Sequence, residues 1–329
     1  MRGFGLFALA LRVHFRGVQE NEMNTIGKLA CLVVAGPLLM LGQTAAQPHV
    51  PAQIVVTVGH HYGHPPPVLT KDDLSVITTR YESLGITGLT PLRGERAALE
   101  LFILVDNCSS CEAGTKFQEM SRFIRSQPAT TSVGVAYITN GKLTVAEAPT
   151  ADRERAIRAL NTPSGSPPAS PFDALKELIG TWRPTWMRRA VVMVTNGMNP
   201  NAQAKHEDPS AEAAIDAAQR AGATVYAIYH PSADYATADA SKIYDGQVQM
   251  AHVAHDTGGE AYFLGFGPAP SIAPFLEDIA DHLSNQYLLE FMAIPAEGPA
   301  ALQEVTVKAK DSDLELMVPE RAWVARTEP

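Results

Sequence analysis

The sequence predicts an α/β protein with a doubly wound, mostly parallel sheet and a small antiparallel β domain formed by its N- and C-terminal segments. Short apolar, β-branched runs alternate with helical patterns of about 10–15 residues, which is typical of βαβ units. The run 101–105 is apolar throughout, as expected of a parallel strand that is covered on both faces. The tail differs, because 286–292, 303–309 and 314–318 alternate apolar and polar residues with no helix between them, which indicates antiparallel strands.

The strands are expected where short β-branched and apolar runs lie between turn signals. Asn140-Gly141 is a strong hairpin signal, so the segment after it is expected to be an antiparallel edge strand. The strand 53–58 precedes the main sheet, and we expect it to pair with the tail in the small β domain. In chain order, the expected strands of the main sheet are 101–105, 132–138, 142–145, 190–194, 224–229 and 260–264.

The helices are expected where apolar residues recur at helical spacing. Phe117, Met120 and Ile124 lie on one face of such a pattern, and Gly222 is a natural cap at the end of another. The expected helices are 114–126, 151–160, 171–182, 210–221, 247–257 and 271–284. Residues 81–97 are polar and irregular and predict a connector, and 231–246 predict a polar insertion.

With 329 residues, the chain is long enough for one sizeable core and a small second domain. We expect a signal region, an N-terminal β segment with its connector, the main α/β domain and a C-terminal β segment, at 1–46, 47–97, 98–285 and 286–329 respectively. The hydrophobic content of 46% and charged content of 19% are ordinary for globular proteins. The net charge of -9, without a basic run, argues against nucleic acid as a partner, because binding phosphates requires a basic surface.

The N-terminal region has the pattern of a secretory signal peptide. Lys28 precedes the apolar run Leu29–Leu41, and small residues surround an expected cleavage site after Ala46. Because a membrane-spanning helix needs roughly 20 apolar residues, no stable membrane span is expected after cleavage. The residues before Met23 do not fit the pattern, so we expect translation to begin at Met23. We therefore expect an exported protein, either periplasmic or extracellular.

Polar side chains follow two of the buried strands. Asp106, Cys108 and Ser110 come directly after 101–105, and Asn196 follows 190–194. In open α/β sheets, ligands bind at the carboxyl ends of the strands, so this is where a functional site is expected. Cys108 and Cys111 form a CxxC pair, and in an oxidising compartment we expect them to form a disulfide bond.

The order of several motifs resembles that of von Willebrand factor type A (VWA) domains, and in particular the bacterial VWFA-related family. The resemblance covers roughly 98–290, with a wider pattern from about 53 to 325, and it implies a Rossmann-like fold. Its landmarks are Asp106 with Ser110, Gly134-Val135-Ala136-Tyr137, Asp173-Ala174-Leu175, Val194-Thr195-Asn196-Gly197, Thr257-Gly258-Gly259-Glu260-Ala261-Tyr262 and Gln286-Tyr287-Leu288-Leu289.

The resemblance also implies a magnesium site, the metal-ion-dependent adhesion site (MIDAS), that binds a carboxylate of a partner protein. Asp106 and Ser110 match its pattern, whereas Cys108 replaces a serine and Asn196 replaces an aspartate. The threonine of the middle loop has no clean match, and Ser170 is the nearest hydroxyl. Because magnesium prefers hard oxygen ligands, and a thiol is soft, we interpret the site as degenerate and vestigial, with no cofactor bound.

Two functions remain open. The favoured one is a non-catalytic adhesion-type module that binds a protein or a cell-envelope component. The alternative is a thiol-disulfide oxidoreductase that uses Cys108-Ser109-Ser110-Cys111, because a CxxC between a strand and a helix is typical of thioredoxin-like enzymes. No thioredoxin-like cis-proline context follows the motif, so we expect a structural disulfide and no enzymatic activity.

The histidines of the chain are interpreted as solvated or locally bonded. His60, His61 and His64 lie in a proline-bounded turn without a nearby cysteine or carboxylate cluster to complete a metal site. His230, and His252 with His255 on one helix face, could suggest a metal pair, but we interpret them as solvated or locally bonded as well.

Overall fold

The computed structural model describes residues 49–59, 66–106, 113–139, 142–160, 170–183, 187–200, 208–231, 240–267, 269–295 and 300–326. These residues lie in one compact unit, Pro48–Pro329. The expected signal region, the turn with His60, His61 and His64, and Cys108, Ser110 and Cys111 lie outside the described residues. No helix in the described ranges is long and apolar enough to cross a membrane.

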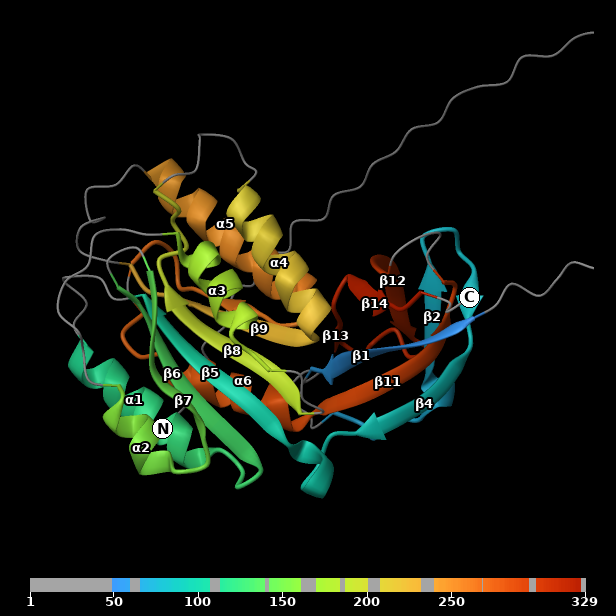
Figure 1. Cartoon of the computed structure of the whole chain (residues 1–329), viewed down its shortest axis with the longest axis horizontal. Helices are drawn as coiled ribbons and strands as arrows, with labels where there is room; N and C mark the ends of the chain where they lie inside the picture. The colour runs from blue at the N-terminus through green and yellow to red at the C-terminus, as the bar shows by residue number, and fades with distance from the viewer. Residues whose placement is uncertain are drawn as a thin grey trace, which may run out of the picture. The chain divides into compact units, whose positions relative to one another are not determined.

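A six-stranded sheet forms the centre of the α/β part (Figure 1). Its strand order is β10-β9-β8-β5-β6-β7, and every neighbouring pair is parallel except β6 with β7. The strands are β5 (Leu99–Asp106), β6 (Thr131–Thr139), β7 (Lys142–Thr150), β8 (Arg188–Thr195), β9 (Ala223–Tyr229) and β10 (Ala261–Tyr262). The doubly wound, mostly parallel sheet predicted from the sequence is therefore confirmed, including its antiparallel edge strand.

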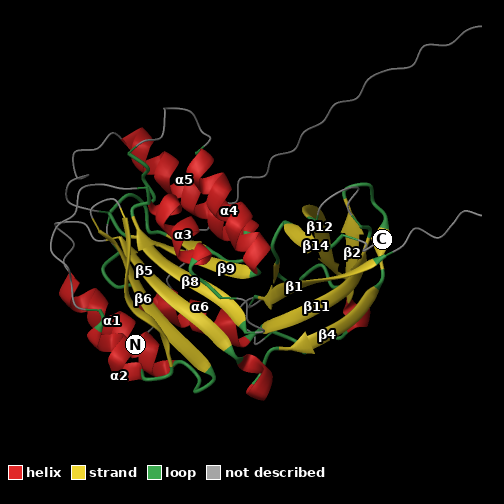
Figure 2. Cartoon of the chain, viewed as in Figure 1, coloured by secondary structure: helices red, strands yellow, loops and turns green. Residues whose placement is uncertain are grey.

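Helices cover both faces of this sheet (Figure 2). Side chains alternate across a strand, so Ile103 of β5 packs into one layer of the core and Phe102 into the other. The layer with Ile103 contains α1 (Ala113–Ser126), α2 (Arg153–Arg158) and α6 (Ala273–Ser284). The layer with Phe102 contains α3 (Pro171–Gly180), α4 (Pro209–Ala221) and α5 (Ala240–Asp256).

The N- and C-terminal segments form two antiparallel sheets, in the orders β13-β1-β11-β4 and β14-β12-β2-β3. Their strands are β1 (Val50–Val58), β2 (Leu74–Thr78), β3 (Ser83–Leu84), β4 (Ile86–Pro91), β11 (Gln286–Ala293), β12 (Ala301–Ala309), β13 (Leu316–Met317) and β14 (Arg321–Val324). Two 3-10 turns, Lys71–Asp73 and Gly94–Ala97, lie in the connecting segments. The predicted pairing of the first strand with the tail is confirmed, because Ile54 of β1 lies opposite Leu289 of β11.

Two predictions of segment type differ from the structure, one in the N-terminal β segment and one in the α/β part. Residues 81–97 were expected to be an irregular connector, but they contain β3 and β4, which pair with β2 and β11 respectively. The insertion predicted at 231–246 ends early, because α5 begins at Ala240 instead of residue 247. In the first case strand pairing, and in the second helix packing, stabilises a segment whose local sequence is only weakly regular.

Candidate functional site

Three neighbouring strands deliver polar residues to the same end of the six-stranded sheet, which we call the carboxyl edge. Asp106 is the last residue of β5, and Thr195 is the last residue of β8. Thr195 lies opposite Tyr229 at the end of β9, and His230 follows. Because parallel strands end together, residues far apart in the sequence meet at this edge, as the sequence predicted for Asp106 and Asn196.

Thr195, which is buried, is hydrogen-bonded to Asp106, which is partly buried. The Thr195 hydroxyl donates a hydrogen bond to Oδ2 of Asp106 at 3.0 Å, and it accepts one from the Gly197 N–H at 3.2 Å. Burial raises the pKa of Asp106 to about 6, although hydrogen bonds from Thr195 and from the Asn196 backbone act in the opposite direction. The carboxyl group is therefore stabilised by a hydroxyl and a backbone N–H, and its negative charge is disfavoured by desolvation.

The side chain of Asn196 forms a hydrogen bond within its own loop. Its Oδ1 accepts a hydrogen bond from the Met198 N–H at 2.8 Å, and the residue is buried. Gly197 has a φ of 72°, and a Cβ at that position would overlap the Gly246 carbonyl oxygen and Met250 of α5. The glycine thus allows α5 to approach the loop closely, and the packing holds Asn196 in place.

Ser170 is a helix cap in this structure. Its Oγ accepts a hydrogen bond from the Asp173 N–H at 3.2 Å, at the first turn of α3, and the residue is only 5% exposed. Capping of this kind satisfies one of the backbone donors that a helix start leaves unpaired. The hydroxyl that the sequence suggested as a metal ligand therefore already has a structural partner.

Lys116 and His230 were not predicted to belong to this edge. The Lys116 ammonium group of α1 lies 2.9 Å from Nδ1 of the His230 ring. The backbone N–H of His230 donates to the Thr195 carbonyl at 2.7 Å. Burial, and then the Lys116 charge, lower the pKa of His230 to about 4. At neutral pH the imidazole is neutral, so its Nδ1 accepts the hydrogen bond from Lys116. The position of His230 directly after a buried strand was the signal that could have identified it.

The VWA resemblance implies a magnesium ion at this edge, so we compared its requirements with the residues present. Magnesium prefers an octahedral set of oxygen ligands, usually with carboxylates among them. Of the four residues assigned from the sequence, three are described, and only Asp106 provides a carboxylate. The amide oxygen of Asn196 and the hydroxyl of Ser170 are used within their own loops. The described residues therefore do not fit a tight magnesium site.

The proposed disulfide and the CxxC chemistry cannot be placed on this edge, because Cys108 and Cys111 lie outside the described residues. Both remain predictions from the sequence.

Comparisons with known proteins find similarity among solved structures only. No protein-family model matches the chain, and no curated protein matches it. One similar structure is the von Willebrand factor domain of the type V pili tip protein Mfa5 from Porphyromonas gingivalis. It has 9% sequence identity and a TM-score of 0.42, and the match covers 59% of this chain and 95% of that one.

A second similar structure is the pilus adhesin SpaC from Lactobacillus rhamnosus GG, with 10% identity and a TM-score of 0.43. A third is proximal thread matrix protein 1 from the mussel byssus, with 14% identity and a TM-score of 0.41. The matches cover 81% and 58% of this chain, and this chain spans about half the length of either protein, 48% and 46%. The first of these structures is a von Willebrand factor domain, the kind of domain that the sequence motifs resemble.

Proposed function

We propose that this chain is an exported, non-catalytic binding module of the VWA class that contacts a protein or cell-envelope component through the carboxyl edge. The observation that supports binding rather than catalysis is that the reactive atoms at this edge are occupied by hydrogen bonds within the protein. Thr195 donates its hydrogen bond to Asp106, and Nδ1 of His230 accepts one from Lys116. With 1% exposure, the Thr195 hydroxyl is out of reach of a substrate, although it lies beside a potential base.

The binding proposed here does not depend on magnesium. A functional cation site would need charge to attract the ion, and Asn196 supplies a neutral amide whose oxygen already accepts from the loop backbone. We propose that Asn196 and Ser170, which stand at metal-ligand positions of the family pattern, now stabilise the conformation of their own loops. The contact surface would then consist of the loops that follow β5, β8 and β9.

Site-specific photo-crosslinking in the native host tests the contact surface. A photoreactive residue at position 200, exposed in the loop after β8, is compared with one at Thr130, exposed just before β6 at the opposite end of the sheet. We expect a specific crosslinked partner only from position 200, with the same yield in the presence of a chelator. Equal crosslinking from both positions would argue against the carboxyl edge as the binding surface.

Calorimetry tests the metal-independent part of the proposal. We expect no magnesium binding by the wild-type protein in the micromolar range. Replacing two residues, Cys108→Ser together with Asn196→Asp, supplies a hydroxyl and a carboxylate at positions where the family pattern has them, and measurable binding is expected to appear. Micromolar magnesium binding by the wild type that is lost in Asp106→Ala would contradict the proposed loss of the site.

A further inference from the structure

A second cluster of ionisable side chains lies at the end of α5, away from the carboxyl edge. His252, His255 and Asp256 belong to the last turn and a half of this helix, and Glu320 lies between β13 and β14 in the C-terminal segment. The helix ends beside the start of β9, because Thr257 accepts a hydrogen bond from the Val225 N–H at 3.1 Å. The cluster is therefore at the amino end of the sheet.

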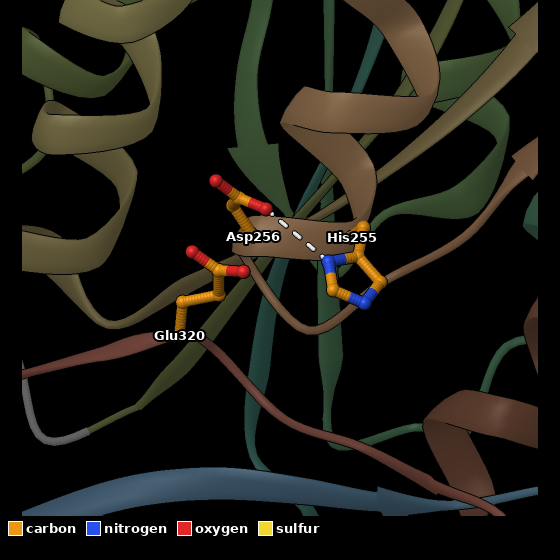
Figure 3. A group of neighbouring side chains, drawn as sticks. All are labelled: His255, Asp256 and Glu320. Carbon is orange, nitrogen blue, oxygen red and sulfur yellow. Dashed lines mark hydrogen bonds and ion pairs between the residues drawn. The ribbon is translucent and has the colours of Figure 1, made fainter. Parts of the chain in front are cut away.

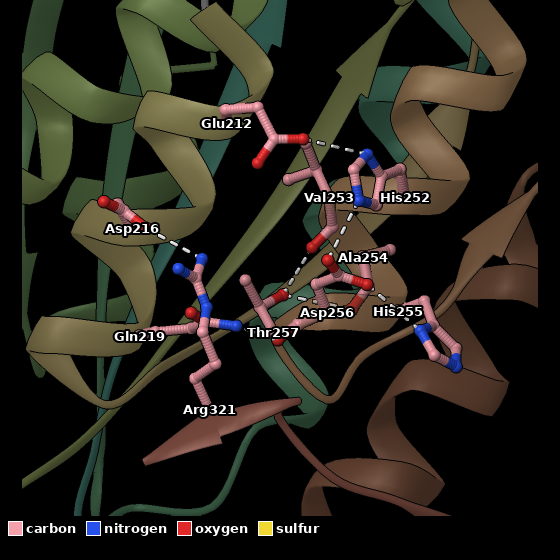
Figure 4. Close-up of polar contacts among 10 residues, drawn as sticks. All are labelled: Glu212, Asp216, Gln219, His252, Val253, Ala254, His255, Asp256, Thr257 and Arg321. Atoms are coloured by element: carbon pink, nitrogen blue, oxygen red, sulfur yellow. Dashed lines mark hydrogen bonds and ion pairs between the residues drawn. The ribbon is translucent and has the colours of Figure 1, made fainter. Parts of the chain in front are cut away.

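Asp256 is the centre of the cluster. Only 7% of the residue is exposed, and its two carboxylate oxygens have different partners. Oδ2 lies 2.9 Å from Nε2 of His252, and Oδ1 lies 3.2 Å from Nδ1 of His255 (Figure 4). The first contact is the i, i+4 pair of a helix face, which fixes the orientation of the carboxylate plane.

Glu320 completes a group of three. One ligand atom each from His255, Asp256 and Glu320 lie within 4.8 Å of one another. Figure 3 shows the two carboxyl groups beside each other, facing the His255 ring. The ligands of a four-coordinate zinc ion, at about 2.0–2.2 Å from the metal, lie about 3.4 Å apart, so a small rotation of the exposed Glu320 side chain is sufficient to form such a site.

The backbone holds Glu320 beside the helix end independently of its side chain. The Glu320 N–H donates to the Asp256 carbonyl at 3.1 Å, and the Glu320 carbonyl accepts from Val305 of β12 at 2.9 Å. Thr257 and Pro319 form an antiparallel bridge. The two segments are thus fixed in register, and the site would require movement of a side chain only.

The ionisable groups of the cluster shift one another's pKa values. Burial and the neighbouring Asp256 raise the pKa of Glu320, and hydrogen bonds to Asp256 raise the pKa of His252 and His255. Although burial acts to raise it, the two histidines lower the pKa of Asp256 to about 2. Independently of these shifts, the carboxyl groups of Asp256 and Glu320 lie next to each other and next to the His255 ring.

We propose that Nδ1 of His255 and the carboxylates of Asp256 and Glu320 bind a divalent zinc-class ion, with water in the remaining position. One imidazole nitrogen and two carboxylate oxygens suit zinc better than magnesium or calcium, which favour oxygen ligands alone. His252 is a positioning residue, because it holds Oδ2 of Asp256 and leaves Oδ1 for the ion. The bound ion would join the end of α5 to the C-terminal segment.

A second histidine–carboxylate group, Glu260, Asp278 and His282, provides a matched comparison. Its His282 is only 4% exposed, and the Tyr262 hydroxyl already donates to Asp278 at 2.8 Å. Asp278→Asn therefore removes a carboxylate of the same type without touching the proposed site.

Calorimetric titration with zinc chloride tests the proposal. The titration uses a background in which His60, His61 and His64 are alanine and Cys108 and Cys111 are serine, so that these other potential zinc ligands are absent. We expect one equivalent of zinc to bind, and His255→Ala and Glu320→Gln each to weaken binding at least about tenfold. His252→Ala is expected to weaken it by about tenfold, and Asp278→Asn to leave it unchanged.

Two further measurements accompany the titration. Cobalt absorption in the same background is expected to show a nitrogen- and oxygen-ligated ion, and zinc is expected to raise the melting temperature in the background but not in Glu320→Gln. His255 has a side chain that is 77% exposed, so its replacement is expected to leave the fold intact. The proposal is wrong if no zinc binds up to about 1 mM, or if binding survives in both His255→Ala and Glu320→Gln.

Discussion

Lys116 and His230 lie 114 positions apart in the sequence, yet they are hydrogen-bonded at the carboxyl edge. A neutral imidazole is required here, because a protonated ring would face the Lys116 ammonium group in a partly dehydrated environment. The folded protein therefore resists protonation of His230, with a pKa of about 4, whereas the histidine of the unfolded chain protonates near its ordinary pKa of 6.5.

This difference predicts an acid-dependent loss of stability. Between about pH 6.5 and pH 4 the unfolded state binds more protons than the folded state, so the free energy of unfolding falls as the pH decreases, by no more than about 3 kcal/mol from this group. In His230→Gln the amide oxygen still accepts from Lys116 but does not titrate. Urea unfolding at several pH values should therefore show a smaller decrease for the variant than for the wild type, and identical pH profiles would contradict the assignment.

At the level of residues, the sequence predicted which side chains end the strands but not what they bond to. The positions of Asp106 and Asn196 follow from the strand pattern, since Asp106 comes directly after an apolar run and Asn196 comes two residues after another. The partner of His230 could not be predicted, because Lys116 lies on a helix whose contact with this edge depends on packing across the sheet. Ser170 was assigned as a potential metal ligand, and its capping bond in the structure gives it a different role.

At the level of elements, the start of α3 provides a test of whether Ser170 acts as a helix cap. Ser170 caps the helix through Asp173, and the following Pro171 favours a helical first turn. Replacing Ser170 by alanine is expected to lower the free energy of unfolding by about 1 kcal/mol, measured by urea denaturation. Ser170→Thr retains a hydroxyl and should lose less. An unchanged stability in Ser170→Ala would show that the cap is unimportant.

The elements that the sequence did not predict have a common explanation. Residues 240–246 contain Gly246 and several polar residues, but α5 includes them because Gly246 lets the helix approach the loop after β8, with Met198 3.0 Å from the position of a Cβ. The segment 83–91 contains two glycines and a proline, but β4 forms because β11 offers an unpaired edge. Both elements depend on partners that are distant in the sequence, and periodicity within a short window does not include such partners.

At the scale of the whole unit Pro48–Pro329, the two ends of the six-stranded sheet differ in what they contact. The carboxyl edge carries Asp106, Thr195 and His230, whose bonds are local to that edge. The amino end packs against the antiparallel β segments, where Arg321 of β14 forms an ion pair of 2.7 Å with Asp216 of α4. The β segments therefore pack against the amino end of the sheet, so loops at the carboxyl edge are able to vary without disturbing them.

Arg188 connects several parts of this unit at the amino end. It lies at the start of β8 and donates to the Leu283 carbonyl at the end of α6 at 2.6 Å, and to the Ala97 carbonyl before β5 at 3.3 Å. It also donates to the side chain of Gln286 in β11. Although burial lowers the pKa of Arg188 to about 10, the guanidinium group remains charged at neutral pH. One partly buried cation therefore links the parallel sheet to the tail.

Removing this link is expected to weaken the unit as a whole. Arg188→Ala leaves the buried oxygens of Leu283, Ala97 and Gln286 without their donor, so the free energy of unfolding should decrease by about 3 kcal/mol. Arg188→Lys supplies the charge without the fork of donors and should recover only part of the loss. Urea unfolding followed by circular dichroism and by tryptophan fluorescence measures the effect, with the exposed Arg122→Ala as a control that should change stability by less than about 0.5 kcal/mol. If Arg188→Ala is as stable as this control, the tail is held to the sheet by its apolar contacts alone.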